Sequence, residues 1–154
     1  MSEHKATIEW RRQSVEFDYK TYNRSHALAF EGGICVPATA AAANIPPTAA
    51  GVPGVDPEQA FVGSISSCHM LWFLHLACRA GLVVDRYVDE AAGVLEKNAE
   101  GRMAMTRVTL RPLVTYAGRR PTEEEHAKLH EGAHDKCYIA NSVKTGIAVE
   151  PRIA

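Results

Sequence analysis

Four cysteines are the side chains of this sequence best suited to redox or metal chemistry, and they stand at positions 35, 68, 78 and 137. They form no Cys-X-X-Cys pair and are too few and too scattered to staple a chain of 154 residues. In a reducing cytosol a disulfide is more often catalytic than structural. Taken singly, Cys68 and Cys137 each favour a packing role, because a buried cysteine behaves as a small hydrophobe. Cys35 and Cys78 suggest no role in chemistry.

Histidines beside two of these cysteines open an alternative, a metal site. Cys68, His69, His134 and Cys137 would supply two sulfurs and two imidazoles, the ligand set of a structural zinc ion. However, His69 follows Cys68 directly and points about 100° away on a helix, so the two cannot easily share one ion. Three histidines also line one side of a predicted helix at spacings of four: His126, His130 and His134.

Start and stop signals define the helix that carries Cys68. Asp56 can cap it, Pro57 suits its first turn, and Gln59 can reach back to form a capping box. Gly81 supplies the stop. Between these signals the side chains are apolar on nearly all sides, which predicts a central, buried helix.

The apolar stretch at residues 60–77 is long enough to raise the question of a membrane span. Three serines and two histidines interrupt it, and each would be costly in hydrocarbon. The stretch is therefore expected to form a buried helix in a soluble core. The interrupting residues are Ser64, Ser66, Ser67, His69 and His75.

A second capping box predicts a second helix. Thr122 and Glu125 form it directly after Pro121, and the helix leads toward Cys137. Cys137 therefore falls where the backbone changes direction and a side chain can be presented to a partner.

Alternating patterns predict strands of half-buried antiparallel sheets. Residues 6–11 and 15–19 alternate weakly between apolar and polar side chains. Residues 27–30 and 34–36 flank Glu31-Gly32-Gly33, which is typical of a hairpin.

A second hairpin is predicted from residues 87–96 and 105–116, joined across residues 98–101. Its second strand has one apolar and one polar face, which favours an antiparallel sheet with one face in water. Residues 147–153 could add a closing strand. Residues 37–55 show no periodicity and are expected to form a long loop, a kind of segment that is often functional. The apolar face of the strand predicted at residues 105–116 consists of Val108, Leu110, Pro112 and Val114.

Together these elements favour an α+β fold in one domain, residues 1–154, with two main helices packed on curved antiparallel sheets. The 46% hydrophobic content suffices for a core. A formal charge of −1, from 17 basic and 18 acidic residues without a basic stripe, argues against nucleic acid and anionic membranes as partners. The first ten residues are charged and lack an apolar run, so no signal peptide is expected and a cytoplasmic location is predicted.

Two segments resemble the osmotically inducible protein C and organic hydroperoxide resistance (OsmC/Ohr) family. Residues 56–61, Asp-Pro-Glu-Gln-Ala-Phe, are similar to the family's Asn-Pro-Glu-Gln-Leu-Phe segment before its peroxidatic cysteine, with the same ten-residue interval from Glu58 to Cys68. Residues 133–138, around Cys137, resemble the segment of its resolving cysteine, although Tyr138 stands where the family usually has proline. The resemblance covers nearly the whole chain.

This resemblance implies an OsmC-like fold and a thiol-dependent peroxidase that reduces organic hydroperoxides to alcohols, usually as an interlocked homodimer. Cys68 would attack the peroxide and become a sulfenic acid, and Cys137 would close a disulfide with it, which needs Cα atoms within about 7 Å. No metal or organic cofactor is implied. Members are recycled by dithiols, in some branches by lipoyl-bearing proteins.

The attacking group must be a thiolate, yet burial in an apolar helix favours the neutral thiol. The resemblance implies an arginine beside Cys68, held by the glutamate that matches Glu58. Arg24 is our candidate, from its own subunit or from a neighbour, because its fork could bind Glu58 and still point a donor at the sulfur. Arg11 and Arg12 are the alternatives.

Ten residues of continuous helix would separate Glu58 from Cys68 by about 15 Å, too far for a shared contact unless Arg24 bridges them or the helix is broken. Gly63 and nearby serines could permit a break, so we predict a bend between Glu58 and Cys68. A different class of function also stays open, an OsmC-like protein without peroxidase activity that binds a hydrophobic small molecule under the loop at residues 37–55.

Overall fold

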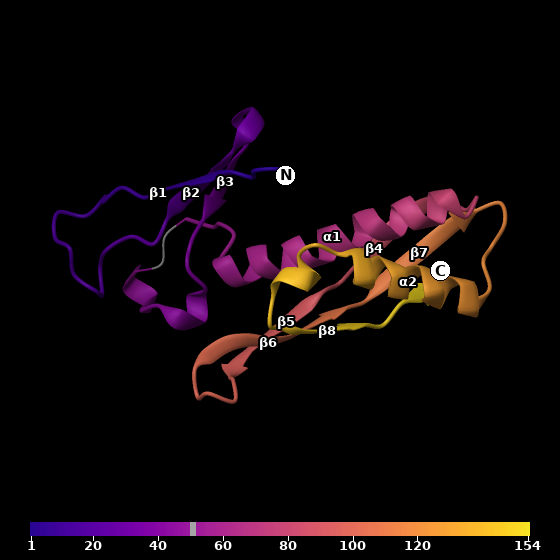
Figure 1. Cartoon of the computed structure of the whole chain (residues 1–154). Coiled ribbons are helices and arrows are strands. Elements are labelled where there is room, and N and C mark those ends of the chain that lie inside the picture. Colours follow the sequence, from indigo (N-terminus) through magenta and orange to yellow (C-terminus); the bar gives the residue numbers. More distant parts are fainter. Residues whose placement is uncertain (50–51) are drawn as a thin grey trace. The chain divides into compact units, whose positions relative to one another are not determined.

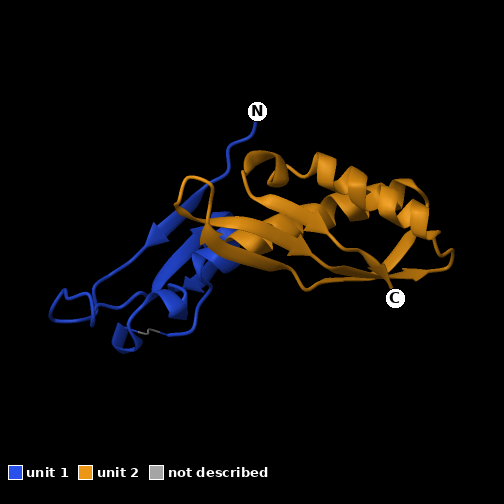
Figure 2. Ribbon diagram, turned by 90° about the horizontal axis from the view of Figure 1, so that it is seen from below, with its two compact units in different colours: residues 1–60 blue, residues 61–154 orange. Residues whose placement is uncertain are grey.

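The computed structural model describes residues 1–49 and 52–154 of the chain. These fall into two compact units, Met1–Ala60 and Phe61–Ala154, which Figure 2 distinguishes by colour. The single domain expected from the chain length stays a prediction. Part of the expected long loop, residues 50–51, lies outside the described residues.

The first unit contains an antiparallel sheet of β1 (Ala6–Glu9), β2 (His26–Phe30) and β3 (Cys35–Ala38). The predicted hairpin between β2 and β3 is confirmed, and Gly32 and Gly33 both take a φ of 78° in the turn that joins them. This left-handed backbone favours glycine.

The strand predicted at residues 15–19 is wrong. Asp18 instead begins a turn, since its carbonyl accepts hydrogen bonds from the amides of Thr21 and Tyr22. Its carboxylate also accepts from the amide of Lys20 at 2.9 Å. Aspartate side chains compete with sheet hydrogen bonding in this way, and the weak alternation of apolar residues did not outweigh it.

The segment after β3 is irregular, as expected, and contains two short 3-10 turns, Ala42–Asn44 and Pro47–Ala49. Its far end returns to the sheet, where Val55 forms a parallel bridge with Ala38. Gly54 permits this approach, because a Cβ atom there would lie 2.9 Å from the backbone of Ala38.

The long helix α1 (Pro57–Arg79) begins and ends where the sequence predicted. The amide of Gln59 donates to the Asp56 carboxylate at 2.7 Å, and the Gln59 side chain accepts from the Asp56 amide. At the other end Gly81 has a φ of 71°, and the amide of Leu82 donates to the carbonyl of Ala77. This bond, with that from Gly81 to Cys78, makes a Schellman motif.

The helix is not broken between Glu58 and Cys68, because α1 is continuous from Pro57 to Arg79 (Figure 1), and the bend between them stays a prediction. The Ser64 hydroxyl donates to the carbonyl of Phe61 at 2.8 Å, so it is satisfied without interrupting the backbone ladder.

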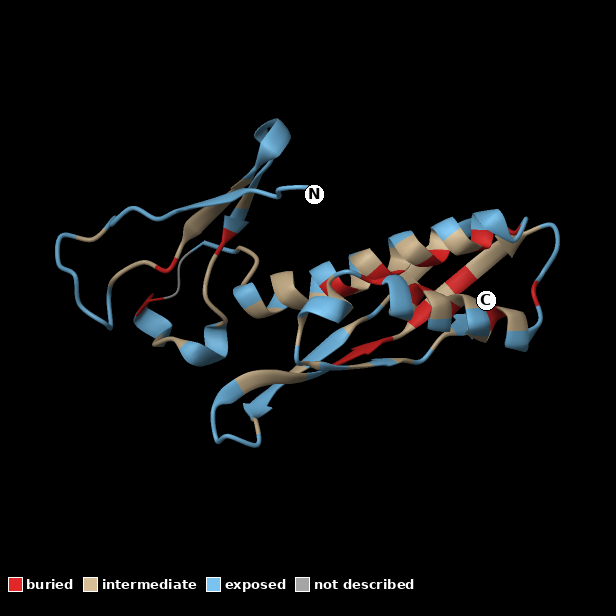
Figure 3. Cartoon of the chain, in the orientation of Figure 1, coloured by how far each residue is buried: buried red, intermediate tan, exposed pale blue. Residues whose placement is uncertain are grey.

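Burial along α1 is confined to one stripe, so the prediction of a helix buried on all sides is wrong for the single chain (Figure 3). Other positions are half-buried or open, and Leu71 is 60% exposed. By length and composition alone α1 could cross a membrane, but its stripe packs into the core of the second unit. The stripe consists of Ile65, His69, Phe73 and Ala77.

The second unit contains two three-stranded sheets. One has the order β4 (Val83–Asp89), β7 (Pro112–Ala117) and β9 (Arg152–Ile153), and the other β5 (Ala92–Lys97), β6 (Met103–Leu110) and β8 (Gly146–Val149). The first two strands of each sheet are antiparallel, as expected, and the third is parallel to its neighbour, so both sheets are mixed.

The hairpin predicted across residues 98–101 is confirmed between β5 and β6. Each of its long predicted strands is, however, divided into two strands that belong to different sheets. Asp89 lies at this division, where its carboxylate accepts a hydrogen bond from the Arg111 amide at 2.6 Å. The predicted apolar face is buried throughout: Val108, Leu110, Pro112 and Val114.

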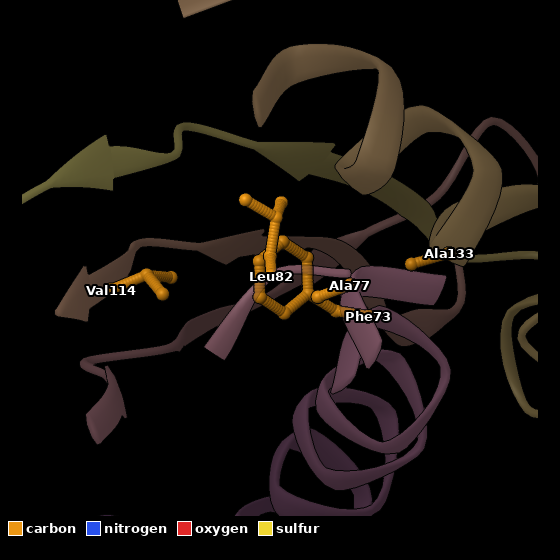
Figure 4. Close-up of a cluster of buried hydrophobic side chains, with 5 residues drawn as sticks. All are labelled: Phe73, Ala77, Leu82, Val114 and Ala133. Atoms are coloured by element: carbon orange, nitrogen blue, oxygen red, sulfur yellow. The ribbon is translucent and has the colours of Figure 1, made fainter. Parts of the chain in front are cut away.

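Helix α2 (Glu123–Lys136) begins with the predicted capping box of Thr122 and Glu125. It contributes Ala133 to a core cluster with α1, β7 and the turn after α1 (Figure 4). The chain thus has an α+β fold, with two helices and mixed sheets. The side chains of the cluster are Phe73, Ala77, Leu82, Val114 and Ala133.

Candidate functional site

Cys68 lies on a face of α1 that borders a cavity of about 540 Å³ in the second unit. The α1 residues of the cavity recur at intervals of three and four, which places them on one side of the helix. Most of the wall is apolar. The lining residues are Ser64, Ser67, Cys68, Leu71, Trp72, His75, Tyr138 and Ile139.

Cys137 is the residue at which α2 ends, and its side chain is completely buried. The amide of Ala140 donates a hydrogen bond to its sulfur at 3.4 Å. Burial, and after it the neighbouring thiol of Cys68, raise the pKa of the Cys137 thiol to about 11. The two predicted cysteines are therefore brought together, both as free thiols.

Aromatic side chains from α1 and from the segment that follows α2 form part of the cavity wall. The rings of Trp72 and Tyr138 meet edge to face, with centroids 5.5 Å apart, and His75 makes a similar contact with Trp72 at 5.6 Å. Sequence reasoning missed His75 and Tyr138 as site residues. The helical spacing of seven from Cys68 to His75 could have identified the first of them.

Arg24 lies in the first unit and is buried there. Its guanidinium donates to the carbonyls of Tyr19 and Tyr22 and lies over the Tyr22 ring, 3.3 Å from the centroid. Arg24 and Glu58 border the same cavity of about 330 Å³. Across residues 1–49 and 52–154, no salt bridge joins them, so the predicted pairing of these two side chains is not formed.

A cluster of buried histidines lies behind Cys68, in the core of the second unit. Nε2 of His69 and Nδ1 of His130 are 2.9 Å apart, and Nδ1 of His126 is 2.8 Å from the Tyr116 hydroxyl. Within the described part of the chain, one ring nitrogen of each histidine has no hydrogen-bond partner. We call His69, His126 and His130 the histidine cluster.

Burial keeps the histidine cluster neutral. It lowers the pKa of His69 to about 4 and that of His130 to about 3, and it also lowers the pKa of His126. Repulsion from neighbouring histidines adds to the first two shifts, from His134 on His69 and mainly from His126 on His130.

The alternative of a Cys/His metal site finds no support in this arrangement. In the described residues, no group of three or more histidine, cysteine, aspartate or glutamate side chains could hold a metal ion. His69 is buried toward His130, while Cys68 borders the cavity, as the angle between neighbouring helical positions requires. Cys35 and Cys78 are exposed free thiols.

Comparison with known proteins agrees with the two resembling segments. The OsmC-like protein family matches residues 49–152. An OsmC-like protein of unknown function from Vibrio cholerae is 42% identical, with a TM-score of 0.94 over 98% of this chain and 99% of that chain. No curated protein matches the chain.

More distant solved structures share the fold. An OsmC-like protein from Mycoplasma pneumoniae is 13% identical, with a TM-score of 0.76 over 99% of this chain and 98% of that chain. An organic hydroperoxide resistance protein of Bacillus subtilis is 17% identical, with a TM-score of 0.64 over the same shares. The family match spans more than half of the chain, and the chain therefore belongs to the OsmC-like family.

Proposed function

We propose that this protein is a thiol-dependent peroxidase that reduces organic hydroperoxides to alcohols through Cys68 and Cys137. The observation that carries the proposal is the close pairing of two thiols, one bordering an apolar cavity and the other completely buried. A two-cysteine peroxidase requires a nucleophile that substrate can reach and a second thiol that the nucleophile can reach.

The reaction balances in two steps. The Cys68 thiolate attacks the terminal peroxide oxygen, the O–O bond breaks, and the alkoxide leaves and gains a proton to become the alcohol. The Cys68 sulfur has then lost two electrons and holds the oxygen as a sulfenic acid. Cys137 attacks this sulfur, an S–S bond replaces the S–O bond, and water leaves.

The chemistry of the cavity favours an organic substrate over hydrogen peroxide. Leu71, Trp72 and Ile139 offer the carbon chain or ring of a hydroperoxide an apolar surface beside the thiol. Related folds carry the name organic hydroperoxide resistance protein, which supports the same substrate class here.

The proposal gives Arg24 the role of stabilising the Cys68 thiolate, from its own subunit or from a partner, while Glu58 borders the same cavity as Arg24 without a salt bridge to it. Arg24→Met should slow the peroxide reaction at pH 7, because the attacking thiolate loses the positive charge that stabilises it. The matched control is Arg11→Met, at an exposed arginine that was one of the two alternatives with Arg12. Equal rates for wild type and Arg24→Met would remove Arg24 from the site.

We also propose a homodimer that works in the cytoplasm and is recycled by a dithiol, with lipoyl-bearing proteins as the first candidates. The dimer would cover apolar surface that the single chain leaves open, such as Met103. A dithiol returns two electrons and two protons to the disulfide, leaving both thiols reduced. Sedimentation at several protein concentrations tests the dimer.

The test of the main proposal counts thiols in a Cys35→Ser, Cys78→Ser chain, which keeps only the two site cysteines. Cumene hydroperoxide added to the reduced protein should remove two thiols per chain and release one equivalent of cumyl alcohol. Adding Cys68→Ser should abolish both changes. If both thiols survive the peroxide, the proposed peroxidase activity is wrong.

The same assay separates the second candidate function, binding of a hydrophobic molecule without catalysis. The apolar lining of the 540 Å³ cavity is the observation that favours it. Surviving thiols together with a melting temperature that rises when an apolar ligand is added would support the binding function.

A further inference from the structure

The two helices that carry the site cysteines are joined through the core by a hydrogen bond between histidines. His69 follows Cys68 in α1, and His130 lies two turns before Cys137 in α2. Nε2 of His69 and Nδ1 of His130 are 2.9 Å apart, and the two side chains are only 1% and 2% exposed. A polar contact of this kind is uncommon in a core that is otherwise apolar.

Aromatic packing fixes His130 in position for this bond. Phe73, one turn after His69 on the buried stripe of α1, stacks on the His130 ring with centroids 4.2 Å apart and planes at 20°. The His69 ring is also stacked against His130, at 5.3 Å and 9°. Two successive turns of α1 therefore hold one side chain of α2.

The bond requires one ring nitrogen to donate and the other to accept, which two neutral rings can provide. Their surroundings meet this requirement, because burial lowers the pKa of each ring well below 7. If one partner is replaced by an apolar side chain, the other ring loses its hydrogen bond in a buried place, which is costly.

Disulfide closure is sensitive to the relative position of the two helices. A disulfide forms only when the two Cα atoms lie within a narrow range, about 4.4–6.8 Å. Apolar side chains can slide against each other at little cost, whereas a buried hydrogen bond fixes both distance and direction. The histidine bond is thus suited to fixing this position.

We propose that His69 and His130 are positioning residues that keep Cys137 within bridging distance of the Cys68 sulfenic acid, an inference that rests on the proposed function. Neither histidine touches the peroxide or exchanges a proton in the step. The S–S bond forms, the S–O bond breaks, and the hydroxide leaves as water with the proton of Cys137.

The experiment follows both chemical steps after one equivalent of cumene hydroperoxide, in the Cys35→Ser, Cys78→Ser chain. Alcohol release reports sulfenic acid formation, and mass spectrometry with dimedone trapping reports how fast the sulfenic acid becomes a disulfide. His130→Phe keeps a ring against Phe73 but cannot bond to His69. It should slow closure about tenfold or more and leave the rate of alcohol release unchanged.

Two further variants separate positioning from general damage to the core. His130→Asn places an amide atom close to where Nδ1 of His130 stands, so it should restore closure to within about twofold of wild type. His126→Phe removes another buried histidine of α2, whose hydrogen-bond partner is Tyr116 of β7, and it keeps a ring where His126 meets Phe73 and His130 edge to face. It should leave closure unchanged.

Wild-type closure in His130→Phe, or equal slowing in all three variants, would overturn the proposal. If His130→Phe does not fold, the test uses the corresponding pair of variants on α1. His69→Phe then removes the hydrogen bond and His69→Gln retains it. If wild type releases no alcohol, the proposed function fails, and positioning is then measured by disulfide exchange with glutathione. The disulfide fraction should fall about tenfold in the apolar variant, and no fall would overturn the inference.

Discussion

Cys68 and Cys137 are neighbours that differ in burial, since Cys68 is half-buried and borders the cavity while Cys137 is completely buried. A peroxide that enters the cavity can reach the first sulfur and not the second. Access to the cavity, as well as nucleophilicity, therefore determines that Cys68 reacts before Cys137. Replacing one cysteine should consequently have a different effect from replacing the other.

Replacement of the two cysteines should stop the reaction at different stages. Cys68→Ser should lower first-turnover alcohol release at least about a hundredfold, because the nucleophile is gone. Cys137→Ser should release alcohol at nearly the wild-type rate and accumulate a sulfenic acid that dimedone traps. Cys78→Ser, at the exposed cysteine of the same helix, is the matched control and should do neither. Equal loss of alcohol release in both site variants would contradict this assignment.

Disulfide closure should accelerate steeply with pH. The pKa of Cys137 is raised to about 11 by burial, so the attacking thiolate is a small fraction at pH 7 and grows about tenfold per pH unit. Stopped-flow tryptophan fluorescence after peroxide mixing should show the closure rate rising from pH 7 to 10. A closure rate that levels off near pH 8 would mean that Cys137 ionises normally.

The same shift predicts how alkali affects stability. Because the folded pKa of Cys137 lies above the ordinary value of 9.0 for a cysteine thiol, the neutral thiol favours the folded state. This contribution is complete below pH 9 and is lost as the pH rises toward 11. Urea unfolding at pH 8 and pH 11 should show less alkaline loss in Cys137→Ala than in wild type.

Acid should destabilise the protein through the histidine cluster. The folded pKa values of His69 and His130, about 4 and 3, lie below the ordinary histidine value of 6.5, so unfolding takes up protons. Stability is complete above about pH 6.5 and falls as the pH drops through 4, by a few kcal/mol in total. Urea midpoints from pH 7 to 4 test this. His69→Phe combined with His130→Phe should flatten the slope, and an unchanged slope would contradict it.

The sequence predicted the helices well because their boundaries depend on local signals. The capping boxes at Asp56 and Thr122 and the stop at Gly81 are set by neighbours within a few residues. The division of each long strand into two sheets was missed, because it depends on the contact of Asp89 with Arg111 across 22 positions. No local pattern encodes such a contact.

The site was predicted only in part, because some of its residues are marked by local sequence and others depend on contacts between distant residues. Cys68 and Cys137 were found through the segments around them, and the structure brings their side chains together. His69 and His130 had been noticed only as possible metal ligands, although their sequence separation of 61 hides a direct hydrogen bond in the core. The single buried stripe of α1 was also missed, since a helix apolar on every side gives no signal of which side faces the core.

The exposed ring of Tyr138 should govern the choice of peroxide. It is 69% exposed, so its loss should affect stability little, yet it forms one wall of the cavity against Trp72. Tyr138→Ala should lower kcat/KM for cumene hydroperoxide about tenfold, because an aromatic substrate loses one of its contact surfaces, and should leave hydrogen peroxide nearly unaffected. Tyr138→Phe keeps the ring and should behave as wild type. An equal fall for both peroxides would instead mean that the residue after Cys137 matters for disulfide closure and not for substrate binding.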